Sequence, residues 1–150
     1  MPNTRIEGHC LCRGVVYEYG GEPNWTVHCH CDSCRRATSS PFTTWISVPR
    51  ASFRFKAGVP RYFQSSPGVR RGFCEACGSP LTYENEIIPD EVHLYAVSLA
   101  DPSHVRPTAH VFVAEQLPWF ETQDDLPRYA ATRRGGAAPI RVGPRVRPLA

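Results

Sequence analysis

Residues 73–78 read FCEACG, in which two cysteines are separated by two residues and followed by a glycine. This is the form of a zinc knuckle, because cysteines at this spacing reach one ion from a single turn and Gly78 permits a backbone conformation that a side chain disfavours. A second pair, Cys10 and Cys12, lies in GHCLC at residues 8–12, where strand alternation places both thiols on one face. Together the pairs predict a closed four-cysteine shell that joins the N-terminal strand to the middle of the chain.

The four cysteines of this predicted shell are Cys10, Cys12, Cys74 and Cys77. A closed zinc site of this kind is structural, and it can contribute on the order of 10 kcal/mol to folding, comparable with the net stability of a domain. Fifteen prolines leave little room for long helices, so a metal cross-link explains how such a chain is stabilised. Disulfides are the alternative, but adjacent Cys-x-Cys pairs close a small, strained ring.

The other three cysteines lie in HCHCDSC at residues 28–34: Cys29, Cys31 and Cys34. Three protein ligands with a vacant fourth position are typical of a catalytic zinc site, where water or substrate completes the shell. The alternative is a site closed by His28 or His30. If the segment is extended, both histidines face away from the thiols, which favours packing roles for them.

Composition indicates a globular protein of 150 residues, of which 41% are hydrophobic and 21% charged. The sequence has no apolar run of the roughly 20 residues that a membrane-spanning helix needs, and its first ten residues lack the apolar core of a secretory signal. We therefore expect a cytoplasmic protein without a membrane partner. In that reducing compartment, close cysteines are more often metal ligands than disulfides.

The C-terminal end is strongly basic, with six arginines and no acidic residue from Arg128 onward. Glycine, proline and alanine are frequent in this stretch, which favours a disordered tail rather than an ordered cationic surface for nucleic acid. We predict one domain over residues 1–132 and a tail over residues 133–150, with no nucleic-acid partner. The sequence gives no prediction of oligomeric state.

Short alternating segments separated by glycine and proline predict an all-β fold of antiparallel strands, packed as a sandwich or irregular barrel. A short helical turn after Cys34 is the one helix expected. The predicted strands cover residues 15–19, 42–48, 52–55, 61–65, 70–74, 81–85, 92–98 and 109–114.

The chemistry of a three-thiolate site favours sulfur substrates over hydrolysis. Three thiolates leave a divalent ion with net negative charge, which reduces its power to acidify water but still suits an exchangeable substrate thiolate. A metal-bound thiol loses its proton and remains a usable nucleophile.

The chain resembles the glutathione-dependent formaldehyde-activating enzyme (GFA) family, also called the centromere protein V-like domain, of the Mss4-like fold. The resemblance covers roughly residues 8–129 and includes all three cysteine groups in order. It runs through GHCLCRGVVYEY (8–19), HCHCDSCRRATSSPFTTWISVP (28–49), FKAGVPRYFQSSPGVRRGFCEACGSPLTY (55–83), VSLADP (97–102) and PTAHVFVAEQLPWFETQDDLPRY (107–129).

The resemblance implies an all-β zinc protein with two ions, one structural at the four-cysteine shell and one at the other three cysteines. At the second ion a glutathione thiol would bind and add to formaldehyde, giving S-hydroxymethylglutathione, a reaction classed under carbon-sulfur lyases. One departure is Ser39, where relatives usually carry glycine. The alternative function is a non-catalytic, zinc-stabilised binding or scaffold protein of the same fold.

Glutathione carries two carboxylates, so an enzyme acting on it should present cations near the metal. Arg35 and Arg36 follow the third cysteine of HCHCDSC directly, and we predict that they bind substrate. The proximity of His110 to the second group is a further point to test. His28, His30 and Asp32 are candidates for a general base, but the sequence does not select one, because zinc itself lowers the pKa of a bound thiol.

Overall fold

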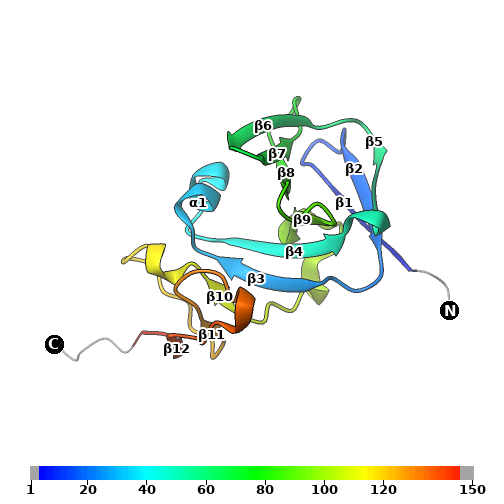
Figure 1. The fold of residues 1–150 in the computed structure, drawn as a ribbon. Coiled ribbons are helices and arrows are strands. Elements are labelled where there is room, and N and C mark those ends of the chain that lie inside the picture. The colour runs from blue at the N-terminus through cyan, green and yellow to red at the C-terminus, as the bar shows by residue number, and fades with distance from the viewer. Residues whose placement is uncertain (1–3, 146–150) are drawn as a thin grey trace. The chain divides into compact units, whose positions relative to one another are not determined.

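The computed structural model describes residues 4–145, and strands make up most of their secondary structure (Figure 1). The α-helix among these residues, α1 (Asp32–Thr38), has seven residues. The predicted all-β fold with little helix is therefore confirmed. Contacts divide the chain into two compact units, with unit 1 formed by Met1–Thr26 and Trp45–Arg106 and unit 2 by Val27–Thr44 and Pro107–Ala150.

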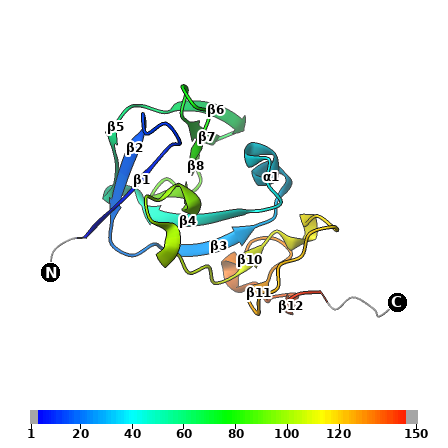
Figure 2. The same ribbon diagram turned by 180° about the vertical axis from the view of Figure 1, so that it is seen from behind.

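Unit 1 contains a three-stranded antiparallel sheet in the order β1-β2-β5, whose strands lie side by side in both ribbon views (Figure 1, Figure 2). Its strands are β1 (Arg5–His9), β2 (Val16–Gly20) and β5 (Phe53–Ala57). A second antiparallel run has the order β4-β9-β8-β7-β6. Those strands are β4 (Thr43–Pro49), β6 (Arg61–Ser66), β7 (Val69–Phe73), β8 (Pro80–Asn85) and β9 (Glu91–Tyr95).

The core of unit 1 forms where the apolar faces of these strands meet. Tyr17 is fully buried and its hydroxyl lies 2.6 Å from that of Ser98. The ring packs directly over Gly8, where an added Cβ would come within 2.2 Å of it. A glycine in β1 therefore permits the close approach of β1 and β2. The buried core also includes Val15, Tyr19, Ile46, Val48, Leu81, Val92 and Leu94, together with Cys10 and Cys74.

Unit 2 is built on strands that include parallel pairs. β10 (His110–Val111) pairs in parallel with β3 (Trp25–Cys29), a strand that enters unit 2 at Val27. β10 also pairs in parallel with β11 (Pro127–Arg128). β12 (Arg141–Val142) pairs antiparallel with β11. Parallel pairing differs from the antiparallel expectation. It is possible because a long connection separates β3 from β10 along the chain.

Each of the eight predicted strands overlaps an observed one, but two are shorter than expected. The strand predicted over residues 92–98 ends at Tyr95, where a 3₁₀ turn begins. The strand predicted over residues 109–114 is reduced to β10, because Phe112 adopts a left-handed φ of 55° that ends the extended backbone. The 3₁₀ turns are η1 (Arg50–Ser52), η2 (Ala96–Ser98), η3 (Pro102–His104), η4 (Val113–Glu115) and η5 (Arg134–Gly136).

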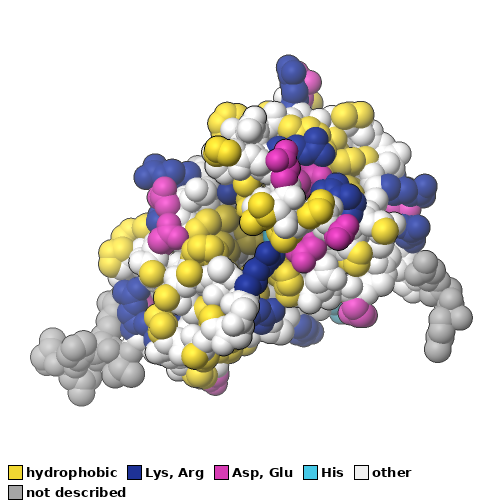
Figure 3. All heavy atoms as spheres, viewed as in Figure 1, with side chains coloured by type: hydrophobic (Ala, Val, Ile, Leu, Met, Phe, Trp, Pro, Cys, Tyr) yellow, Lys and Arg dark blue, Asp and Glu magenta, His cyan; other side chains and the backbone are white. Residues whose placement is uncertain are grey.

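Cationic side chains of unit 1 are matched by acidic ones. Glu84 accepts hydrogen bonds from Arg50 at 2.7 Å and from Arg70 at 3.1 Å, beside a cavity of about 590 Å³ that all three line. On the face drawn in Figure 3, Lys and Arg side chains lie next to Asp and Glu side chains. The arginines of this cavity are thus already paired with a carboxylate.

Among residues 4–145, no helix has the length and hydropathy that crossing a bilayer requires.

The predicted tail lies partly within the described residues. Residues 133–145 include β12, and Arg141 donates to Glu121 at 3.1 Å. The side chain of Arg145 also pairs with Glu121 at 3.3 Å. Residues 146–150 of the predicted tail lie outside the described residues. The boundary at residue 132 and the disordered tail stay predictions.

Ser39 ends α1 in the left-handed conformation, with φ 51° and ψ 40°. Glycine is the usual residue at this position of a helix end, since it adopts a positive φ without the steric cost that a Cβ incurs. The serine therefore retains the helix end at some cost in free energy.

We expect Ser39→Gly to raise the free energy of unfolding by about 0.5–1 kcal/mol. Urea denaturation of the metal-loaded chain measures this value. Ala37→Gly, inside the same helix, is the matched control and should lower the free energy by about 1 kcal/mol. A Ser39→Gly variant no more stable than the parent would contradict the prediction.

Candidate metal centres

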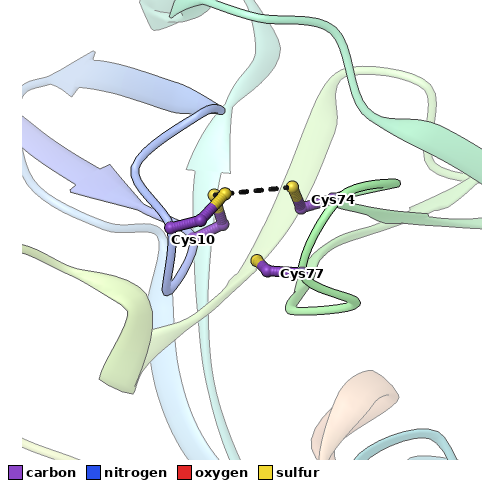
Figure 4. A group of neighbouring side chains, drawn as sticks. Cys10, Cys74 and Cys77 are labelled. Carbon is purple, nitrogen blue, oxygen red and sulfur yellow. Dashed lines mark hydrogen bonds between the residues drawn. The ribbon is translucent and has the colours of Figure 1, made fainter.

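The first candidate centre gathers four cysteine sulfurs within unit 1. The four Sγ atoms lie within 4.8 Å of one another, and they belong to Cys10, Cys12, Cys74 and Cys77. Figure 4 shows the labelled side chains of Cys10, Cys74 and Cys77 directed toward one another. The Sγ of Cys12 lies 3.6 Å from that of Cys10 and 3.7 Å from that of Cys74. Zinc–sulfur bonds of roughly 2.3 Å in a tetrahedron place sulfurs about 3.8 Å apart, so the spacing fits a zinc ion.

Two tight turns position these thiols. β1 ends at His9, so the prediction that Cys10 and Cys12 share one face of an extended strand is wrong. The chain instead turns at Cys10, whose carbonyl accepts from the backbone N–H of Arg13, a residue with a positive φ of 62°. This turn brings the two sulfurs together more closely than strand alternation would.

The opposite turn follows β7 and has the predicted knuckle form. Gly78 has a φ of 75°, and its N–H donates to the carbonyl of Cys74 at 2.8 Å. The hydroxyl of Ser79 accepts from the N–H of Leu11 at 2.9 Å. Ser79 therefore links the two turns as well as bordering the sulfurs.

The pKa values of Cys12 and Cys77 are shifted in opposite directions. The Ser79 hydroxyl, which lies 3.2 Å from the Sγ of Cys77, lowers the pKa of that thiol to about 5. The pKa of Cys12 is raised to about 11, because the neighbouring thiols outweigh the N–H of Gly14 that favours its thiolate. Crowded thiols cannot all lose their protons without a nearby cation, so this group is suited to a metal ion.

The second candidate centre gathers three sulfurs within unit 2. Cys29 ends β3, Cys31 is the N-cap of α1, and Cys34 lies in the first turn of that helix. The Sγ of Cys34 is 3.7 Å from that of Cys29 and 2.8 Å from that of Cys31. The shorter separation must widen by about 1 Å to match a tetrahedral zinc shell. Among residues 4–145, no fourth metal-binding side chain gathers with these three sulfurs.

The start of α1 organises this second group. The sulfur of Cys31 accepts from the backbone N–H of Cys34 at 3.3 Å, as an N-cap side chain does. The pKa of Cys31 is raised all the same, because the interaction with Cys29 that lowers it is outweighed by that with the thiol of Cys34 and by burial. Hydrogen bonds with Cys31 and Cys34, together with burial, raise the pKa of Cys29. A shared cation would again relieve this competition among thiols.

The helix was predicted to start after Cys34, but it begins at Asp32 and includes that ligand candidate. Its last turn is held by Thr38, whose hydroxyl donates to the carbonyl of Cys34 at 2.8 Å. Thr43 donates to the same carbonyl at 3.3 Å. The backbone at Cys34 is therefore fixed from two sides.

The histidines of HCHCDSC face a different set of partners from the thiols. His30 is fully buried, and its Nε2 lies 2.8 Å from the Nδ1 of His110. The Nε2 of His110 in turn lies 2.9 Å from a carboxylate oxygen of Asp124. The Nδ1 of His28 lies 2.8 Å from the hydroxyl of Thr44. Burial lowers the pKa of His28 to about 4 and of His30 to about 3, so both imidazoles are neutral at pH 7.

The predicted substrate residues have unequal surroundings. Arg35 donates through Nε to the carbonyl of His30 at 3.1 Å and through a terminal nitrogen to the carbonyl of Glu115 at 3.0 Å. Its guanidinium thus ties the ligand loop to η4. The side chain of Arg36 is 78% exposed and pairs with Asp32 at 2.9 Å. Substrate binding by Arg35 and Arg36 stays a prediction.

A scan against known protein families matches residues 5–115 to the family described as Glutathione-dependent formaldehyde-activating enzyme. The match spans more than half of the chain and contains all seven cysteines. The chain belongs to the GFA family.

Two individual proteins resemble this GFA member. A curated uncharacterized lyase of Schizosaccharomyces pombe is 34% identical over 77 residues, which are 51% of this chain and 56% of the relative. The chain thus matches little more than half the length of this relative. A crystal structure of a Rhodobacter sphaeroides protein has a TM-score of 0.54 and 21% identity, covering 67% of this chain and 91% of that chain. This second likeness concerns the fold alone.

Sequence reasoning missed two side chains that border the histidines. Asp124 contacts His110, as described above, and Arg128 is fully buried and donates to an oxygen of Asp124 at 3.2 Å. No cysteine lies near either residue in the sequence. An available signal was the pair of acids at residues 124–125 ahead of the arginine, but acidic residues in a loop are more often solvated.

We expect Arg35→Ala to lower the free energy of unfolding by about 1–3 kcal/mol, because it leaves two backbone carbonyls without their charged donor. Arg36→Ala is the matched control and should stay within about 0.5 kcal/mol of the parent, since an exposed ion pair contributes little. Denaturant titration of both metal-loaded variants measures these values. Equal stability of the two variants would contradict the structural role of Arg35.

Proposed function

We propose that this GFA member is a zinc-dependent carbon-sulfur lyase. It forms S-hydroxymethylglutathione from glutathione and formaldehyde, or handles a related thiol adduct. The observation that carries the proposal is the three-sulfur group of Cys29, Cys31 and Cys34, which gathers with no fourth metal-binding side chain among residues 4–145. The description of the family and the name of the yeast relative as a lyase support the same activity.

The proposed reaction balances without a redox partner. The sulfur of the thiol forms a bond to the carbon of formaldehyde while the carbon–oxygen π bond breaks, and the thiol proton ends on the new hydroxyl oxygen. In reverse, the carbon–sulfur bond breaks and releases the thiol and the aldehyde. The protein must therefore bind a thiol, hold it as a thiolate and present it to a small aldehyde.

The seven cysteines divide this task in two. We assign Cys10, Cys12, Cys74 and Cys77 to a structural zinc that ties β1 to the turn after β7. The other three thiols would hold the second ion. A zinc ion bound there supplies a Lewis acid that lowers the pKa of a substrate thiol in its open position. The reducing cytoplasm suits this assignment, since it keeps all seven thiols available.

The burial of the thiols limits the side from which substrate can approach. Cys29 and Cys34 are 5% and 6% exposed, so substrate has to approach from the side of the less buried Cys31. Phe42 stacks on Phe120 at a ring separation of 5.8 Å, and its ring lies 5.4 Å from that of His30. Arg36 lies within α1 and has an exposed side chain, and with Arg35 it stays a candidate to bind a glutathione carboxylate. No general base is assigned.

The alternative is a zinc-stabilised scaffold in which both ions are structural. Cys31→Ser separates the two functions sharply, because serine is a favoured N-cap and preserves the start of α1 while removing a ligand. For the lyase, Cys31→Ser should lose one metal ion and at least about 100-fold in adduct formation while the unfolding free energy changes by about 1 kcal/mol.

Cys77→Ser is the matched variant at the other group. Loss of the closed shell should cost several kcal/mol of stability and the other metal ion. Metal content, denaturant unfolding and adduct formation are measured on the same preparations. Equally severe unfolding of both variants, with no adduct formed by the parent, would favour the scaffold.

Glutathione should also bind directly to the metal of the second group. In the cobalt-substituted protein, glutathione should change the visible absorption, since a new thiolate enters the coordination shell. S-methylglutathione is the matched control and should leave the spectrum unchanged, because its sulfur has no proton to lose. If both ligands change the absorption in the same way, or if neither ligand changes it, direct binding of the glutathione sulfur is ruled out.

A further inference from the structure

Three side chains of unit 2 converge apart from the sulfur groups. One nitrogen each of His28 and His110 and one carboxylate oxygen of Asp124 lie within 4.8 Å of one another. The rings of the two histidines have centroids 4.8 Å apart and are tilted by 33°. Neutral imidazoles and a carboxylate form a ligand set that divalent transition ions bind well.

The remaining polar atom of each side chain already has a partner. The Nδ1 of His28 lies 2.8 Å from the hydroxyl of Thr44, and the Nδ1 of His110 lies 2.8 Å from the Nε2 of His30. Such partners on the far nitrogen fix the ring orientation of metal-binding histidines. The Nε2 atom of each ring is therefore the nitrogen left to bind an ion.

Asp124 is oriented in the same way. Its Oδ1 accepts from the N–H of Leu126 at 3.0 Å and from Arg128 at 3.2 Å. Its Oδ2 lies 2.9 Å from the Nε2 of His110. Bonds of about 2.1 Å from an ion to nitrogen and oxygen place neighbouring ligands roughly 2.9–3.4 Å apart, depending on the coordination geometry. The observed separation lies within that range.

We propose that His28, His110 and Asp124 form a third metal site, which takes a divalent transition ion through two nitrogens and one oxygen. It is separate from both cysteine groups and does not rest on the proposed lyase function. His110 is fully buried, whereas the side chain of Asp124 is 35% exposed. An ion can therefore enter from the Asp124 side, where water completes its shell.

The charges around the site select the kind of ion. Arg128 places a positive charge beside Asp124, which Glu121 partly offsets at 3.8 Å from the guanidinium. One partly neutralised carboxylate is a poor site for magnesium or calcium, which prefer several oxygen ligands. Two imidazoles instead favour zinc, cobalt or nickel.

A hydrogen-bonded network without an ion is the alternative for the same atoms. In that arrangement His110 donates through Nε2 to Asp124, and the Nε2 of His28 has no hydrogen-bond partner among residues 4–145. A metal ion would engage all three atoms at once. The two arrangements therefore differ in whether His28 takes part.

The test uses the full chain with both cysteine groups loaded with zinc, to which cobalt(II) is added. We expect one further equivalent of cobalt to bind without release of zinc, and its X-ray absorption spectrum to show nitrogen and oxygen neighbours but no sulfur. Asp124→Asn keeps the shape of the side chain but loses its charge and should weaken cobalt binding at least about tenfold. His28→Gln should do the same.

His104→Gln is the matched control, because His104 is 86% exposed and pairs with Asp101 at 3.4 Å in unit 1. It should leave cobalt binding unchanged. The absence of a further equivalent, cobalt uptake matched by zinc release, or uptake unaffected by either Asp124→Asn or His28→Gln would overturn the proposal. The zinc content of the cysteine groups shows whether each variant is folded. If Asp124→Asn or His28→Gln has lost this zinc, the test rests on the variant that retains it.

Discussion

Close packing of thiols is the constraint on which the rest of this molecule depends. Sulfurs held within 4.8 Å of one another compete for protons, and they become a stable group of thiolates only around a cation. The turn after β1 and the turn after β7 lie 62 residues apart in sequence at Cys12 and Cys74. A cation shared by them would cross-link β1 to β7 in a chain whose longest described helix has seven residues.

The two cysteine groups are built by different local structures. This difference is the basis for the proposed structural role of the four-cysteine group and the proposed catalytic role of the three-cysteine group. Two turns enclose the four-cysteine group from opposite sides, so its four sulfurs could complete a tetrahedral shell around one ion. The three-cysteine group combines a strand end, a helix N-cap and the first helical turn, all within six residues. So short a segment would supply ligands from one side and leave the other open, as the proposed metal that binds an exchangeable thiol requires.

Polar side chains around the second group act mainly on its backbone. Arg35 binds the carbonyl of His30, and Thr38 and Thr43 bind that of Cys34. His30 connects the ligand loop to His110 and so to Asp124. The family match includes the cysteines of the loop, whereas the metal site proposed at His28, His110 and Asp124 follows from the convergence of these side chains.

The sequence by itself determined the strand-rich fold, eight of the strands and the division of seven cysteines into four and three, because these follow from alternation and from spacing along the chain. It extended the N-terminal strand over Cys10 and Cys12, missed β3, β11 and β12, and started α1 too late. Only the tertiary structure brought His110 and Asp124 to the histidines of residues 28–34, because parallel pairing of β3 with β10 joins segments about 80 residues apart. No local pattern encodes such a pairing.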